Sequence, residues 1–330
     1  MTQHKPRVLV TPTVLAGIDG LFLEVLRAGG LEAVYPARPV QPTESDLLED
    51  LPGISAVLAG SEPYTRRVIE SSPGLRVIAR AGVGYDAVDV AAATEHGIAV
   101  TITPGTNQDT VAEHTFALIL GLAKKVVAGD RTVRSGSWAR EPSLPLRGRT
   151  LGIAGLGRIG KAVALRGAGF GMALLAYEPF PDEAFVKQVG VTLVPLERLL
   201  AESDYLSLHM PLTPESRHVI NRRTLALMKP TAFLINTARG GLVCEADLLE
   251  ALRAGRLAGA ALDVFEQEPP GANPLFELDN VLLTPHTAGV DLQSRDDMAL
   301  HAARAIVALY RGDWPAHQVV NPEVREMFCW

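Results

Sequence analysis

Short apolar runs recur through the first hundred residues, and segments with helical periodicity separate them. The runs are rich in β-branched residues and predict strands at 7–10, 54–58, 75–79 and 98–100. Between them, segments such as 21–28 and 88–96 repeat apolar residues every three or four positions, which predicts helices. The first part of the chain is therefore expected to form an α/β unit.

The same alternation restarts at Leu151 and continues to residue 283. It predicts further strands that begin at Leu151 and at 173–177, 205–208, 232–235, 259–263 and 281–283. Strands that alternate with crossover segments form parallel sheets covered on both faces, with right-handed connections. The chain is therefore expected to contain a second α/β unit.

Two long helices are predicted near the junctions between these units. The segment 110–127 carries apolar residues nearly all round, which is typical of a helix buried between domains or subunits. The segment 292–310 follows the last predicted strand, and the tail 312–330 is too short to form a domain. We expect a discontinuous first domain, 1–103 with 312–330, and a second domain over 104–311.

Composition narrows the class of protein. The 330 residues are 47% hydrophobic, which provides core for two domains. A net charge of -6 and a pI near 5.8, without a basic run, argue against a nucleic-acid or anionic-membrane partner. The apolar runs fall far short of the ~20 residues that span a bilayer, so a cytoplasmic protein is expected. Cys244 and Cys329 lack the spacing of a disulfide framework or a metal site.

The strand that begins at Leu151 leads into the glycine pattern Gly155-x-Gly157-x-x-Gly160 and then into a helix. The first glycine permits a tight turn, the second lets the backbone approach a phosphate, and the third lets the helix pack against its strand. The helix N-terminus favours anions, and Glu178 ends the next strand at the spacing of a ribose-binding acid. This predicts a dinucleotide site in an α/β fold of two Rossmann-like, doubly wound parallel-sheet domains.

Three polar residues follow later strands of the second unit. Arg239, Glu268 and His286 each lie beyond a β run, and ligands bind at the carboxyl edge of open α/β sheets. Alone, each is more simply interpreted as a surface charge, a loop carboxylate or a non-catalytic histidine. Their joint placement after a dinucleotide motif predicts that they converge on a nicotinamide.

With three further motifs, the chain resembles the D-isomer-specific 2-hydroxyacid dehydrogenases over essentially its whole length. The motifs are Arg80-Ala-Gly-Val-Gly-Tyr-Asp86, Pro104-Gly-Thr-Asn-Gln-Asp-Thr-Val-Ala-Glu-His114 and His209-Met-Pro-Leu-Thr213. The resemblance implies hydride transfer between NAD and C2 of a 2-hydroxy acid, with Arg239, Glu268 and His286 as catalytic residues.

The residue types suit this reaction. A proton must leave the hydroxyl as the carbonyl forms, and a histidine such as His286 exchanges protons near neutral pH. Glu268 would hydrogen-bond the imidazole and fix its tautomer, and Arg239 would bind the substrate carboxylate and polarise the C2 oxygen. Glutamate at position 268 argues against the formate dehydrogenases, which carry glutamine there.

The resemblance also implies binding residues. Those for NAD are Gly155, Gly157, Arg158, Ile159, Gly160, Glu178, His209, Pro211, Thr237, Ala238, Thr110 and Asp263, the last of these at the nicotinamide. Those for the substrate are Arg80, Val83, Gly84 and Arg239. His114 and His209 are interpreted as structural or cofactor-lining. A homodimer is expected through the nucleotide domains, with an exposed loop at 135–149 as part of the contact.

Two alternatives stay open. The corepressors of the C-terminal-binding-protein type share the fold, the nucleotide site and a similar triad, although nothing here resembles their regulatory tails. D-3-phosphoglycerate dehydrogenase is the alternative enzyme, because Arg80 and Arg140 match phosphate-side arginines. Ala59 replaces a further arginine, Glu62 lies nearby, and the separate C-terminal regulatory domain is not expected. We therefore expect small keto acids such as glyoxylate or hydroxypyruvate as substrates.

Overall fold

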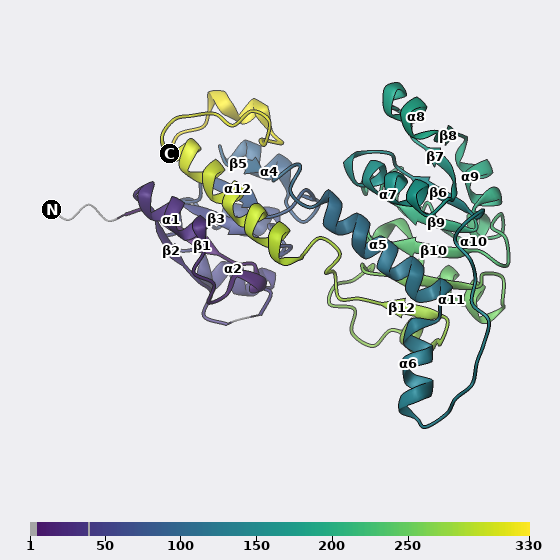
Figure 1. Cartoon of the computed structure of the whole chain (residues 1–330). Coiled ribbons are helices and arrows are strands. Elements are labelled where there is room, and N and C mark those ends of the chain that lie inside the picture. Colours follow the sequence, from purple (N-terminus) through teal and green to yellow (C-terminus); the bar gives the residue numbers. More distant parts are fainter. Residues whose placement is uncertain (1–4, 39) are drawn as a thin grey trace. The chain divides into compact units, whose positions relative to one another are not determined.

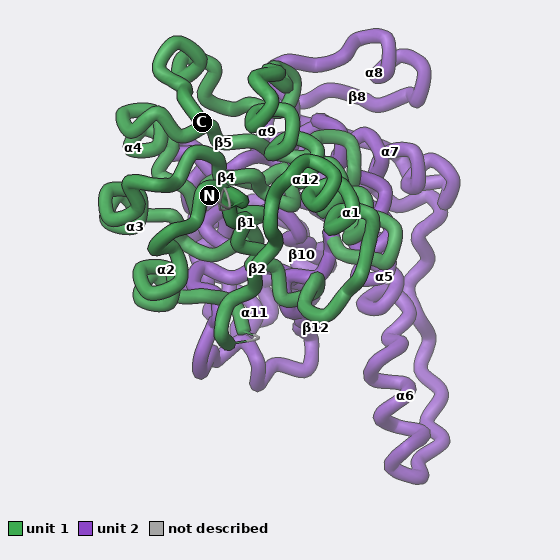
Figure 2. Tube along the Cα trace, turned by 90° about the vertical axis from the view of Figure 1, so that its left-hand side faces the viewer, with its two compact units in different colours: residues 1–107, 290–330 green, residues 108–289 purple. Residues whose placement is uncertain are grey.

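The computed structural model describes residues 5–38 and 40–330 and divides into two compact units. The first comprises Met1–Asn107 with Val290–Trp330, and the second comprises Gln108–Gly289 (Figure 2). Each unit is an α/β structure built on a parallel sheet, as the sequence predicts, and Figure 1 follows the chain through both.

The sheet of the first unit has five parallel strands in the order β2-β1-β3-β4-β5. Its strands are β1 (Arg7–Val10), β2 (Glu32–Val34), β3 (Ala56–Ala59), β4 (Val77–Arg80) and β5 (Ala99–Thr101). The strand order reverses between β1 and β3, so a crevice at the carboxyl ends of these strands is a place where doubly wound folds bind ligands.

Helices cover both faces of this sheet. They are α1 (Leu21–Ala28), α2 (Glu44–Asp50), α3 (Arg66–Glu70), α4 (Val90–Glu95) and α12 (Leu292–Tyr310). Along β1, Val8 and Val10 join a core with α1 and α12, whereas Leu9 joins the opposite core with α2, α3 and α4. Side chains alternate along a strand, so a strand buried on both faces reads as a continuous apolar run.

The C-terminal helix and tail belong to the first unit. Helix α12 packs against α1, β3 and β4, whereas the sequence boundaries placed residues 292–310 in the nucleotide domain. The tail continues across the same unit, where Asn321 Oδ1 accepts the Val100 N–H at 2.9 Å. Packing against α1, which the sequence pattern does not encode, decides where this helix lies.

The second unit has seven parallel strands in the order β12-β11-β10-β9-β6-β7-β8. They are β6 (Thr150–Ala154), β7 (Ala173–Tyr177), β8 (Thr192–Leu193), β9 (Tyr205–Leu208), β10 (Phe233–Asn236), β11 (Gly259–Leu262) and β12 (Val281–Leu283). The order reverses between β6 and β9, so the loop after β6 opens at the switch point of the sheet.

Seven helices accompany this sheet in the part of the chain that the structure describes. They are α5 (Gln108–Ala123), α6 (Val126–Arg134), α7 (Arg158–Gly169), α8 (Glu183–Val189), α9 (Leu196–Glu202), α10 (Arg222–Leu225) and α11 (Glu245–Arg253). One face is covered by α5 and α7, and the other by α9, α10 and α11. No helix within 5–38 and 40–330 is long and apolar enough to cross a membrane.

The single helix predicted over 110–127 is wrong at its C-terminal end. Helix α5 ends at Ala123, and Lys125 adopts a left-handed backbone with φ of 52° before α6 begins at Val126. A left-handed residue interrupts the helical hydrogen-bond ladder. The apolar side chains of α5 are mostly buried within its own unit, whereas α6 buries none and projects from that unit (Figure 1).

Candidate active site

The glycine turn after β6 has the geometry of a phosphate-binding loop. Gly155 has a φ of +97°, and a Cβ built on it would lie 2.7 Å from the backbone of His209. A Cβ on Gly160 would lie 2.1 Å from the carbonyl oxygen of Gly155, so only glycine allows this approach of α7 to its strand. Around a Cβ on Gly157 the space is open to 4 Å. The exposed Gly157 backbone at the start of α7 can therefore approach a pyrophosphate.

Glu178 is held against this turn from the end of β7. Its Oε2 accepts the Leu156 N–H at 2.7 Å, and its Oε1 accepts the Phe180 N–H at 3.0 Å. Each carboxylate oxygen has capacity for a second hydrogen bond. The half-buried side chain is thus fixed where ribose hydroxyls can donate to it, one strand away from the phosphate loop.

The remaining second-unit residues predicted to bind NAD follow neighbouring strands of the same sheet edge or begin flanking helices. Arg158 and Ile159 begin α7, Thr110 lies in the first turn of α5, His209 and Pro211 follow β9, and Thr237 and Ala238 follow β10. Thr237 is buried, and its Oγ1 lies 3.1 Å from Oγ1 of Thr115. The structure brings these loops to one edge because all seven strands are parallel.

His209 is a neutral imidazole in this edge. Its Nε2 lies 2.7 Å from Ser207 Oγ, and its Nδ1 is buried without a hydrogen-bond partner among the described residues. Burial lowers the pKa of His209 from 6.5 to about 3. The backbone of His209 packs against Gly155, and a neutral ring at this position suits the structural or cofactor-lining interpretation.

Arg239 is positioned by a buried turn after β10. Asn236 is fully buried, and its side chain accepts the Ala238 N–H at 3.1 Å and donates to the Arg239 carbonyl at 2.9 Å. A Cβ on Gly240 would lie 1.9 Å from the carbonyl of Phe265, so glycine is required there. This close approach brings the Arg239 turn against the segment that leads to Glu268.

Asp263 organises the loop that carries His286. Its carboxylate is fully buried at the end of β11 and accepts hydrogen bonds from Thr284 Oγ1 at 2.5 Å, Thr287 N at 2.9 Å and Ala288 N at 2.8 Å. Its carbonyl accepts the His286 N–H at 2.8 Å. The nicotinamide contact expected of Asp263 stays a prediction, whereas its bonds across the loop make it a positioning residue for His286.

His286 and Glu268 form a direct pair. The Nδ1 of His286 lies 2.6 Å from Glu268 Oε2, and Glu268 Oε1 accepts the Phe265 N–H at 2.9 Å. An ionised carboxylate only accepts, so Nδ1 carries a proton and Nε2 is the ring atom left for proton exchange with a ligand. The imidazole side chain is 38% exposed, so a ligand can reach it.

The other substrate residues expected from sequence lie in the first unit. Arg80 ends β4 and is 7% exposed, and its Nε donates to the Gly84 carbonyl at 3.0 Å. Val83 and Gly84 are half-buried in the loop that follows. Arg80 thus supports the loop expected to bind the substrate carboxylate. Arg140 lies in an exposed segment of the second unit.

Some residues that build the site cannot be recognised from sequence motifs. Asn236, Thr284 and Phe265 act through side-chain or backbone bonds to turns rather than through a catalytic signature. Thr284 bridges Asp263 and His114, whose Nε2 lies 3.0 Å from the threonine hydroxyl. For Thr284, the available sequence signal was that it is a polar residue two positions before His286.

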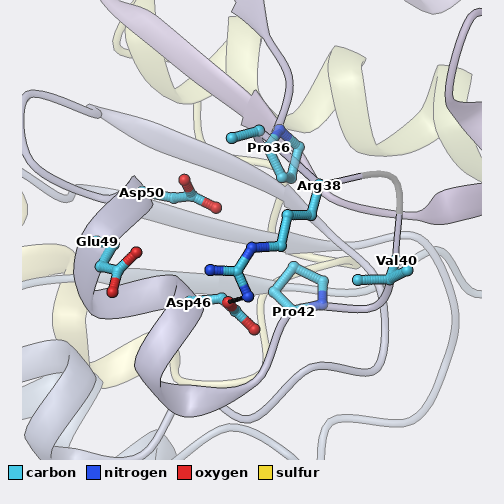
Figure 3. A pocket seen from close by; sticks show the side chains of 8 residues that line it. Pro36, Arg38, Val40, Pro42, Asp46, Glu49 and Asp50 are labelled. Atoms are coloured by element: carbon cyan, nitrogen blue, oxygen red, sulfur yellow. Dashed lines mark ion pairs between the residues drawn. The ribbon is translucent and has the colours of Figure 1, made fainter.

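A separate pocket of about 70 Å³ lies beside α2 in the first unit (Figure 3). Arg38 and Asp46 form an ion pair of 3.1 Å at its wall, and no predicted site residue lines it. Among the described residues, no group of histidine, cysteine and acidic side chains could hold a metal ion.

Comparison with known proteins points to one family. Residues 116–288 match the model of the D-isomer specific 2-hydroxyacid dehydrogenase, NAD binding domain. A glyoxylate reductase of Korarchaeum cryptofilum is 46% identical and covers 97% of each chain. A D-3-phosphoglycerate dehydrogenase of Archaeoglobus fulgidus is 39% identical over 91% of this chain and 57% of its own length. A D-lactate dehydrogenase structure from Aquifex aeolicus, complexed with NAD and lactic acid, has a TM-score of 0.84 and 30% identity, covering 95% of this chain and 98% of that one.

Proposed function

Since the chain belongs to the D-isomer-specific 2-hydroxyacid dehydrogenases, we propose that it interconverts small 2-keto acids and D-2-hydroxy acids with NAD. The observation that carries the proposal is the His286–Glu268 pair at 2.6 Å, in the same unit as the glycine turn. An acid/base group and a dinucleotide loop on one sheet edge are what this redox reaction requires.

The second unit fits the dinucleotide. The open space at Gly157 admits the pyrophosphate to the N-terminus of α7, and the fixed carboxylate of Glu178 can accept the ribose hydroxyls. NAD, when bound, supplies the hydride acceptor in one direction and the donor in the other. A negative charge at Glu178 disfavours the 2′-phosphate of NADP.

The chain's own residues handle the proton and the substrate charge. In reduction, His286 donates a proton from Nε2 to the C2 oxygen, and in oxidation it accepts that proton. Glu268 holds Nδ1–H, stabilises the ring when it is charged and keeps its orientation. The permanently charged Arg239 binds the substrate carboxylate and polarises the C2 oxygen. The loop at Val83 and Gly84 in the first unit carries backbone N–H groups that can bind an anionic group of a substrate.

The substrates proposed are unphosphorylated, with glyoxylate and hydroxypyruvate first. The relative in Korarchaeum cryptofilum, which matches over nearly the full length, is named a glyoxylate reductase. D-3-phosphoglycerate oxidation is the second candidate, favoured by the identity to the Archaeoglobus fulgidus protein and by the position of Arg80. Ala59 and the buried Glu62 argue against it, because neither can bind a phosphate.

We also propose a homodimer that forms in the cytoplasm through the nucleotide-binding unit. The apolar helix predicted over 110–127 does not support a dimer, because α5 buries most of its apolar side chains within its own unit. Support comes instead from the projecting helix α6 and its following loop, where Val126, Val133 and Trp138 are 57%, 55% and 74% exposed. A cluster of exposed large apolar side chains is typical of a protein interface.

A side-by-side measurement of kcat/KM with NADH tests the proposed reaction. Glyoxylate and hydroxypyruvate are expected to be reduced, and His286→Ala is expected to lose about 10²- to 10⁴-fold in kcat while NADH binding is retained. His317→Ala, at an exposed position, serves as the matched control. Binding of NADH without reduction of any 2-keto acid would favour the cofactor-sensing alternative.

A further inference from the structure

Glu62 is a buried carboxylate that the proposed reaction does not use. It is 1% exposed and lies three residues beyond β3, at the carboxyl edge of the first unit's sheet. Thr11 follows β1 at this edge, and Arg80 and Gly84 lie at the end of β4. The edge includes the switch point between β1 and β3, where doubly wound sheets bind ligands.

Three donors converge on one oxygen of this carboxylate. Oε1 of Glu62 accepts the Gly60 N–H at 2.9 Å and the Tyr64 hydroxyl at 2.8 Å, together with the hydroxyl of Thr11. Burial, followed by the charge of Glu62, raises the pKa of Tyr64 well above 10.0, so the phenol stays a neutral donor. Donors directed at a carboxylate favour its charged form. The cluster therefore directs three donors at this carboxylate, and none of the three is a cation.

The Glu62 carboxylate and the segment expected to bind the substrate follow two neighbouring strands, β3 and β4. Ala59 of β3 is in register with Arg80 of β4, and neighbouring strands are about 4.8 Å apart. Arg80 in turn bonds the carbonyl of Gly84, in the proposed carboxylate-binding loop. One buried carboxylate and one buried guanidinium at this edge sum to zero charge, whereas a phosphate site needs converging cations.

We propose that Glu62 is a specificity-determining residue that disfavours substrates with a phosphate or another anion at the end remote from C2. The proposal rests on the proposed function, in which the loop at Val83 and Gly84 binds the substrate carboxylate. A buried charge is weakly screened by solvent, so it acts on an anion several ångströms away without touching it. Small uncharged ends, as in glyoxylate and hydroxypyruvate, avoid this repulsion.

The rigid surroundings make Glu62→Gln the informative change. Hydrogen bonds from Gly60, Tyr64 and Thr11 to Oε1 hold the Glu62 side chain in place. Glutamine keeps the size and one acceptor oxygen and removes the charge. Tyr64→Phe is the matched control, because it removes one donor and leaves the charge in place.

The readout is the ratio of kcat/KM for 3-phosphohydroxypyruvate to that for hydroxypyruvate, with NADH. Glu62→Gln is expected to raise this ratio about tenfold, and Tyr64→Phe to change it less than about twofold. A purely structural role would lower kcat/KM for both substrates by the same factor and leave the ratio unchanged. An unchanged ratio in Glu62→Gln, or the same rise in Tyr64→Phe, would overturn the proposal.

A wild-type measurement covers the case in which Glu62→Gln does not fold. D-glycerate is expected to inhibit glyoxylate reduction at least about tenfold more strongly than its 3-phosphate. Equal or stronger inhibition by the phosphate ester would overturn the role of Glu62. Failure of the wild-type enzyme to reduce glyoxylate and hydroxypyruvate would instead contradict the proposed function.

Discussion

The Nδ1 atom of His286 lies 2.6 Å from Oε2 of Glu268, whose other oxygen accepts the Phe265 N–H at 2.9 Å. In Glu268→Gln the amide oxygen is expected to stay on that backbone donor, which turns the amide NH₂ toward Nδ1. The ring is then held as the neutral tautomer with its proton on Nε2, and the charged, doubly protonated form that transfers a proton is disfavoured. We expect kcat to fall on the order of 10²-fold or more, with the KM for NADH unchanged, in steady-state kinetics.

Glu266→Gln is the matched control for this change. It makes the same chemical substitution two residues away in the same loop, where the carboxylate pairs with His218 at 3.2 Å. Its kcat is expected to stay within about twofold of wild type, since a partly exposed pair contributes little. Equal losses in the two variants would mean that Glu268 acts only by holding the loop.

The carboxylate of Glu178 is expected to set the preference for NADH over NADPH. Two backbone N–H groups fix it at the end of β7, so its charge faces the ribose hydroxyls and repels a 2′-phosphate. Glu178→Gln keeps the shape, and the ratio of kcat/KM for NADH to that for NADPH should fall about tenfold. Glu183→Gln, at an exposed position in α8, should leave it unchanged. A wild-type preference for NADPH would contradict this assignment.

Two glycines of α7 are expected to respond oppositely to alanine. In Gly160→Ala the new Cβ would lie 2.1 Å from the Gly155 carbonyl oxygen, so the phosphate loop must move. NADH affinity, measured by fluorescence titration, should fall at least about tenfold.

In Gly169→Ala the Cβ meets no atom within 4 Å, and we expect unchanged affinity. The free energy of unfolding of that variant should rise by about 0.5–1 kcal/mol. Wild-type affinity in Gly160→Ala would exclude Gly160 from loop geometry.

His209 is expected to make the free energy of unfolding depend on pH. Its folded pKa is about 3, against 6.5 ordinarily, so the unfolded chain binds more protons between these values. The stabilising contribution of His209 to the free energy of unfolding is present above pH 6.5 and is lost as pH falls toward 3. At pH 4.5 the loss relative to pH 7 should be about 2–3 kcal/mol, measured by urea unfolding.

His209→Gln should show a correspondingly smaller loss of unfolding free energy between the two pH values. His317→Gln, in which an exposed histidine is replaced, should behave as wild type. If wild type and His209→Gln lose the same free energy, another group is responsible for the acid sensitivity.

The exposed apolar side chains around α6 predict the assembly. We expect the wild type to sediment as a dimer of the 35.3 kDa chain at micromolar concentration. Trp138 is 74% exposed, and Trp138→Glu should shift the equilibrium to monomer by placing a charge in the contact. Leu227→Glu, at a position 41% exposed beyond α10, is the control and should stay dimeric. A wild-type monomer would contradict the proposal.

The local sequence pattern was enough to predict most of the strands, helix α12 and most of helix α5. The predicted segments 173–177, 205–208 and 281–283 match β7, β9 and β12, and 292–310 matches α12. Such elements carry their own signal, because a buried strand is a continuous apolar run bounded by polar residues. The short strands β2 and β8, half-exposed and only three and two residues long, lack that signal. The left-handed break at Lys125 has none either.

The residues of the candidate site likewise fall into two groups: those that the sequence pattern indicates, and those whose contacts only the structure shows. The glycine spacing and the polar residues after strands marked Gly155, Glu178, Arg239 and His286 in advance, because chemistry at a sheet edge requires those residue types. The chain alone does not show that Gly240 packs against Phe265, that Asp263 holds the His286 loop, or that Glu62 is buried among three donors. Each is a contact between segments far apart in sequence or at a turn, and only the assembly of the parallel sheets brings such groups within hydrogen-bond distance.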